Sequence, residues 1–115
     1  MSNVTIWHNP KCSKSRASLA LLQERGLQPT VVEYLATPPS AEDIAAVLRM
    51  LGVSARGLMR PDEPEYTALG LASVDDEPSL IRAMIEHPIL IQRPVVIHAG
   101  KAIIGRPPEG ILSIL

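Results

Sequence analysis

The only cysteine of this 115-residue chain lies in a segment whose composition favours thiol chemistry. Cys12 stands in "NPKCSKSR", residues 9–16, with Lys11, Lys14 and Arg16 close to it in the sequence. Nearby cations favour the ionised form of an acidic group and so lower its pKa. The thiolate is the nucleophilic form of cysteine, and the segment therefore predicts a nucleophile that is largely ionised at neutral pH.

The elements on either side of Cys12 support the same prediction. "VTIW", residues 4–7, is apolar and β-branched and predicts a buried strand that ends near His8. From Ser13 the apolar residues recur with helical spacing, and Gly26 stands where the helix should end. The first N–H groups of a helix have no partners within it, so they can stabilise a thiolate at Cys12. Outside such a context a lone cysteine is usually a small buried hydrophobic residue.

The basic residues of this segment also indicate a bound anion. Lys14 and Arg16 fall in the first turn of the predicted helix, where the helix dipole disfavours cations. An oxyanion held by the N–H groups of the loop would offset that cost. The alternative is that both side chains extend into water, where salt screens the penalty.

Two neighbouring polar residues have alternative roles. His8 can tune the thiol or shuttle a proton, or it can be a surface residue at the end of a strand. Ser15 can donate a hydrogen bond to the sulfur from one helical turn along, or it can cap the helix. The sequence has no Cys/His set with metal-ligand spacing and no glycine-rich phosphate loop, so we expect no metal site.

The remaining elements predict a mixed α/β fold. Ser40 and Asp43 have the spacing of a capping box and open an amphipathic helix that ends at Gly52. The other predicted elements are a strand at 30–35, a less regular stretch at 53–77 with a short helix in "SARGLMR" (54–60) and a loop-rich part at 61–76, a helix that starts at Pro78 and stops before Pro88, a hairpin of strands at 94–97 and 101–104, and a final helix after Pro108. The order β-α-β, helices, β-β-α is that of a thioredoxin-like fold. We predict one domain over residues 1–115, with a helical insertion at about 38–88.

The composition limits the classes of function. The net charge of −1 and the pI of about 6.3 give no general attraction to nucleic acids or to an anionic membrane. No stretch approaches the ~20 apolar residues that span a bilayer. A single cysteine cannot close an internal disulfide and fits a reducing compartment. We therefore expect a cytoplasmic protein without nucleic-acid or membrane partners.

Four segments of the chain together form a specific pattern: "HNPKCSKSR" at 8–16, "LMRPDEPEYTALGL" at 58–71, "HPILIQRPVVI" at 87–97 and "IGRPPEGIL" at 104–112. With these segments, essentially the whole chain closely resembles the glutaredoxin-coupled arsenate reductases of the ArsC family. The resemblance implies a thioredoxin-like fold with a helical insertion. It also implies that Cys12 is the nucleophile and that Arg60, Arg93 and Arg106 bind the oxyanion, although each arginine taken alone is equally consistent with a surface charge.

The resemblance assigns three further residues and the reaction partners. His8 and Ser15 match residues that help to lower the cysteine pKa, and Pro94 matches the cis-proline that faces the active cysteine in thioredoxin-like folds. The implied substrate is arsenate. This chain has no second cysteine with which to expel the product, so the electrons must come from another thiol. The resemblance implies glutathione as that reductant, followed by glutaredoxin, and no bound cofactor.

Two other functions fit some of the same features. One is a thiol-regulated binding protein like the Spx-type regulators, which share this fold and contact RNA polymerase. Those proteins typically carry a C-x-x-C switch, and Ser15 occupies the second position of that motif here. The other is a monothiol oxidoreductase that acts on glutathione mixed disulfides and needs no oxyanion.

Overall fold

The computed structural model describes residues 4–115, which form two compact units. The first, called the sheet unit below, comprises residues 4–37 and 93–115. The second, the helical unit, comprises residues 38–92 and occupies the place predicted for the insertion at about 38–88. That residues 1–115 form a single domain stays a prediction.

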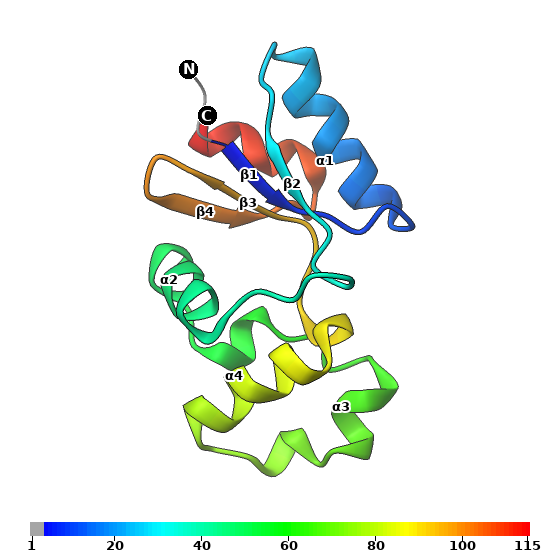
Figure 1. The fold of residues 1–115 in the computed structure, drawn as a ribbon, viewed down its shortest axis with the longest axis vertical. Coiled ribbons are helices and arrows are strands. Elements are labelled where there is room, and N and C mark those ends of the chain that lie inside the picture. Colours follow the sequence, from blue (N-terminus) through cyan, green and yellow to red (C-terminus); the bar gives the residue numbers. More distant parts are fainter. Residues whose placement is uncertain (1–3) are drawn as a thin grey trace. The chain divides into compact units, whose positions relative to one another are not determined.

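The sheet unit is built on four strands, β1 (Val4–Trp7), β2 (Thr30–Val32), β3 (Val95–His98) and β4 (Lys101–Ile104). Their order in the sheet is β2-β1-β3-β4 (Figure 1). Helix α1 (Ser13–Glu24) connects β1 to the parallel strand β2, while β3 runs antiparallel to both β1 and β4. This arrangement confirms the predicted α/β fold. Because β1 lies inside the sheet, the loop that carries Cys12 begins at the end of a central strand.

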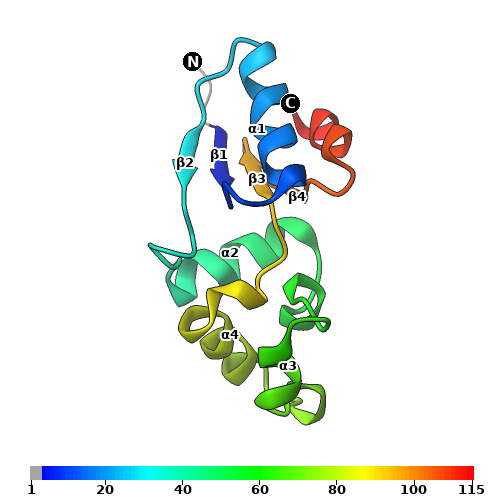
Figure 2. The same ribbon diagram turned by 90° about the vertical axis from the view of Figure 1, so that its right-hand side faces the viewer.

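One face of the sheet is covered by α1 and by the C-terminal segment, as Figures 1 and 2 show from two directions. The core of this unit consists of Val4, Ile6, Leu22, Val96 and Ile111, all almost completely buried. Alternate residues of a strand point to the same face, so the first two of these lie side by side beneath the helix. Burial of each such side chain stabilises the fold by roughly 1.5–3 kcal/mol, and through Leu22 it holds α1 against the sheet.

The final helix predicted after Pro108 is a 3-10 helix, spanning Pro108–Ile114. It spans only seven residues, and it contains Gly110, whose conformational freedom disfavours a regular α-helix. The Nδ1 atom of His98 lies 2.7 Å from the carbonyl oxygen of Ile114 and ties this segment to the end of β3.

The helical unit contains α2 (Ala41–Leu51), α3 (Pro64–Ala68) and α4 (Glu77–Glu86). Short 3-10 turns lie at Ala55–Leu58, Leu71–Ser73 and Pro88–Leu90. The predicted capping box is confirmed, since Asp43 N–H donates to Ser40 Oγ at 3.1 Å and Ser40 N–H donates to Asp43 Oδ2 at 3.2 Å. α2 then ends at Gly52, which has a φ of 72°.

Two sequence predictions are wrong in detail. The second strand stops at Val32 rather than at residue 35, because the Glu33 carbonyl accepts hydrogen bonds from Ala36 and Thr37 and turns the chain. The stretch at 61–76, predicted to be rich in loops, holds α3 and the 3-10 turn Leu71–Ser73, whereas the short helix predicted within 54–60 is present as the 3-10 turn Ala55–Leu58. α3 begins with Pro64, a residue whose fixed φ suits the first helical position. Among residues 4–115, no helix has the length and apolar character needed to cross a bilayer.

Candidate active site

Cys12 stands at the N-terminal end of α1. It is the N-cap residue, with extended backbone angles (φ −99°, ψ 122°), and its free thiol is half-buried. The N–H groups of the first helical turn therefore lie next to the side chain, and the positive end of the helix dipole favours a negative charge there. The sequence prediction of a cysteine between strand and helix is confirmed.

The loop before Cys12 is fixed by its own hydrogen bonds. Asn9 accepts from the Lys11 N–H through its side-chain oxygen at 3.0 Å and from the Cys12 N–H through its carbonyl at 3.0 Å. At the helix start, Arg16 Nη1 donates to the Pro10 carbonyl at 2.8 Å. Sequence reasoning missed Asn9, although an Asn-Pro pair is a signal for this kind of side-chain turn.

The pKa of the Cys12 thiol lies below its ordinary value. Burial is the largest influence and raises the pKa, but the backbone N–H groups of Ser15 and Lys14 lower it, as do the charge and hydrogen-bonding capacity of the Arg93 guanidinium. The sulfur forms no regular capping hydrogen bond, and the effect of these N–H groups comes from their position at the positive end of the helix. Together these groups outweigh burial and favour the thiolate.

The flanking cations Lys11, Lys14 and Arg16 extend into solvent. All three side chains are exposed, where water and salt screen their fields. The charge that favours the thiolate is that of Arg93, which is distant in sequence.

Arg93 and Pro94 form the part of the site that comes from the second half of the sheet unit. The Arg93–Pro94 peptide bond is cis, and Gly105 N–H donates to the Pro94 carbonyl at 2.9 Å. A Cβ atom on Gly105 would lie 2.8 Å from Pro94 Cγ and 2.6 Å from Ser18 Oγ, so only glycine fits beside this proline. Arg93 Nε is buried and has no hydrogen-bond partner among the described residues, which leaves a donor for a ligand oxygen.

His8 and Ser15 interact with each other. His8 is 6% exposed, and its Nδ1 lies 2.6 Å from Ser15 Oγ, which also accepts from the Asn9 N–H at 3.0 Å. Burial lowers the pKa of His8, the Glu33 charge raises it and the Arg16 charge lowers it; the net shift is downward, so the ring is mainly neutral at pH 7. The Ser15 hydroxyl therefore fastens the loop to the helix, and Ser15 acts on the sulfur through its backbone N–H.

This geometry predicts different effects for two buried serines on the same face of α1. Ser15→Ala should lower the free energy of unfolding by about 1–3 kcal/mol, because it leaves His8 Nδ1 and the Asn9 N–H without a partner. Ser18→Ala is the matched control, since Ser18 is equally buried but its hydroxyl has no partner among residues 4–115. It should leave the stability unchanged or raise it. Urea unfolding of both variants measures the difference, and equal losses would contradict the proposed role of the Ser15 hydroxyl.

The other two predicted arginines lie in different surroundings. Arg106 follows β4 and is exposed, and its side chain makes no hydrogen bond or ion pair within the described residues. The Arg106–Pro107 bond is a second cis peptide, which the sequence analysis did not predict.

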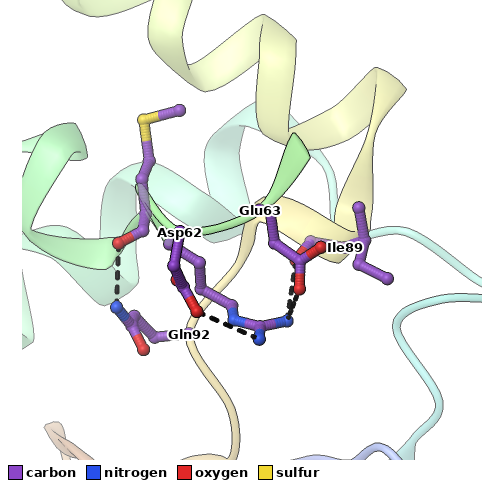
Figure 3. Close-up of polar contacts among 6 residues, drawn as sticks. Asp62, Glu63, Ile89 and Gln92 are labelled. Carbon is purple, nitrogen blue, oxygen red and sulfur yellow. Dashed lines mark hydrogen bonds and ion pairs between the residues drawn. The ribbon is translucent and has the colours of Figure 1, made fainter. Parts of the chain in front are cut away.

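Arg60 belongs to the helical unit, where its Nη1 lies 2.6 Å from Glu63 Oε1 and its Nη2 lies 3.9 Å from Asp62 Oδ2 (Figure 3). The sequence analysis did not identify either acidic partner.

The chain is similar to known proteins along its whole length. The model of the ArsC family matches residues 7–114. A protein named arsenate reductase from Neisseria meningitidis serogroup A is 47% identical over 100% of both chains. The Escherichia coli protein YfgD, described as uncharacterized, is 51% identical over 97% of this chain and 96% of its own. The solved structure of an arsenate reductase from Vibrio cholerae has a TM-score of 0.96 and 46% identity, and it covers 99% of this chain and 98% of its own.

Proposed function

The chain belongs to the ArsC family, and on this premise we propose that it is an arsenate reductase whose nucleophile is Cys12. The observation that carries the proposal is the environment of the thiol. The first N–H groups of α1 and the Arg93 guanidinium lower its pKa, and the same guanidinium retains a buried donor, Nε, that has no partner among residues 4–115. This arrangement supports a nucleophile at Cys12 with an oxyanion-binding group, Arg93, beside it.

The proposed reaction begins when the Cys12 thiolate attacks arsenic. An arsenic–sulfur bond forms, and one arsenate oxygen leaves as water after it takes up protons. A second thiol then attacks this adduct; the two sulfurs end as a disulfide, and arsenic accepts two electrons and leaves as arsenite. In total, two thiols are oxidised to one disulfide, and one oxygen atom of arsenate becomes water.

The positively charged arginines reduce the repulsion between the thiolate and arsenate in the first step. Arsenate carries about two negative charges at neutral pH, and a thiolate that approaches it meets like-charge repulsion. Planar guanidinium groups bind such oxygens through paired N–H donors and stabilise the charge that develops in the transition state. We assign this role to Arg93 next to the thiol, and to Arg60 and Arg106 by their match to the family pattern.

The second thiol must come from another molecule, because Cys12 is the only cysteine. We propose glutathione as the immediate reductant and glutaredoxin as the protein that reduces the resulting mixed disulfide on Cys12. The reaction then needs no bound cofactor. It also needs a reducing compartment, which the cytoplasm provides.

An NADPH-coupled assay with glutathione, glutaredoxin and glutathione reductase tests this proposal. We expect NADPH oxidation that depends on arsenate and stops when glutathione is omitted. A wild-type protein that ignores arsenate but reduces a glutathione mixed disulfide would instead be a monothiol oxidoreductase. A protein inactive in both assays that is retained by the RNA polymerase α-subunit in a pulldown would be a thiol-regulated binding protein. Either result would overturn the proposal.

A further inference from the structure

We propose that Glu63 is a positioning residue for Arg60: its carboxylate orients the guanidinium so that the edge formed by Nε and Nη2 is presented to an oxyanion. This inference rests on the proposed function, because that function assigns oxyanion binding to Arg60. It concerns a residue of the helical unit to which the sequence analysis gave no role.

The backbone of Arg60 is held in place before its side chain is considered. Met59 and Ile91 form an antiparallel bridge, and Arg60 N–H donates to the Leu90 carbonyl at 2.8 Å. On the other side of the bridge, the Gln92 side chain donates from Nε2 to the Met59 carbonyl at 2.8 Å (Figure 3). The segment that carries Arg60 is thus fastened to residues 89–92, and only the arginine side chain is left to be oriented.

The Glu63 carboxylate supplies that orientation. Its Oε1 lies 2.6 Å from Arg60 Nη1, and the Ile89 carbonyl accepts from the same nitrogen at 3.4 Å. Only 12% of the Arg60 side chain and 17% of the Glu63 side chain are exposed, so this ion pair is well shielded from water. Because both contacts fall on Nη1, the opposite edge of the planar group has only one charged neighbour among the described residues, Asp62 at 3.9 Å.

The position of Glu63 in the chain suits this role better than a capping role. Glu63 is the N-cap residue of α3, where a side chain commonly accepts a hydrogen bond from the N–H groups of the first turn. Here it makes no such bond, and its carboxylate is turned to Arg60 instead. The start of α3 therefore sets the backbone position of Glu63, while its side chain forms the ion pair with Arg60.

Orientation of the arginine in advance should strengthen oxyanion binding, because a long free side chain loses conformational entropy when a ligand immobilises it. Glu63→Ala should therefore raise the KM for arsenate about tenfold and change kcat much less. Glu63→Gln keeps an oxygen that can accept from Nη1 while the negative charge is removed. It should keep KM close to that of the wild type, which separates the effect of geometry from that of charge.

The experiment is a double-mutant cycle on the full chain, with KM and kcat measured in the coupled assay. The variants are Glu63→Ala, Glu63→Gln, Arg60→Ala and the double variant Arg60→Ala/Glu63→Ala. Glu86→Ala is the matched control, since Glu86 is an exposed carboxylate at the end of α4 in the same unit and forms no ion pair among the described residues. We expect no effect of the control, and no further rise in KM when Glu63→Ala is added to Arg60→Ala. Rescue by Glu63→Gln would show that a loss in Glu63→Ala does not come from general unfolding.

Two results would overturn the inference alone: a wild-type KM in Glu63→Ala, or a full additional rise in KM when it is combined with Arg60→Ala. In both cases the wild-type protein still reduces arsenate, and the proposed function stands. A wild-type protein without arsenate turnover would overturn the proposed function together with the inference.

Discussion

Replacement of Cys12 by serine is expected to abolish arsenate reduction, with kcat/KM lower by at least ~10³-fold. A serine hydroxyl is not appreciably ionised at neutral pH, so the groups that favour a thiolate at this position have no anion of comparable reactivity to stabilise. A serine also cannot form the disulfide through which electrons pass from glutathione to arsenic. The NADPH-coupled assay measures the loss.

The substitution is small, so the loss should not reflect unfolding. Cys12 is half-buried and its sulfur accepts no formal capping hydrogen bond, and we therefore expect the thermal unfolding midpoint to change little. Serine is itself a favourable N-cap residue. Turnover close to that of the wild type would show that the nucleophile lies elsewhere, and the proposed mechanism would be rejected.

Replacement of Arg93 by alanine is the second large effect that we expect, a fall in kcat/KM on the order of 10²-fold. Two losses combine in this variant. The thiol loses the positive charge that helps to lower its pKa, so a smaller fraction is ionised at pH 7. The oxyanion loses a planar group whose buried Nε has no other partner among the described residues.

Two further variants separate these losses from a general effect of charge. Arg93→Lys keeps the charge but not the planar donor fork, so it should retain the lowered thiol pKa better than it retains arsenate affinity. Arg82→Ala removes an exposed arginine of α4 in the helical unit and should have no effect. Steady-state kinetics and the pH dependence of thiol alkylation measure the two properties. An Arg93→Ala variant with wild-type values for both would exclude Arg93 from the site.

Local features of the site could be predicted from the sequence because they depend on neighbours in the chain. The strand end, the Pro-containing loop and the start of α1 are consecutive, so the place of Cys12 at a helix N-terminus follows from residues 4–26 alone. The capping box of α2 was predictable for the same reason. Hydrophobic spacing also indicated the β3–β4 hairpin.

Contacts between distant residues could not be predicted in this way. The sequence analysis named the helix N–H groups and the flanking cations as groups that activate the thiol, but it did not give this role to Arg93, which only the folded sheet brings to the thiol. From the sequence, the Ser15 hydroxyl could bind the Cys12 sulfur or cap the helix, whereas in the structure it forms a hydrogen bond with His8 Nδ1. Glu63 lies close to Arg60 in sequence, but an acidic residue three positions away is too common to indicate an ion pair without the fold.

The rate of Cys12 alkylation as a function of pH tests the central claim most directly, because the chain has no other cysteine to contribute to the signal. Only the thiolate reacts, so the rate should stay high as the pH falls and decline only when the pH passes through the lowered pKa. Free cysteine has its inflection at a pH of about 8.5, and we predict an inflection for Cys12 clearly below that value. An inflection at or above the value of free cysteine would contradict the account.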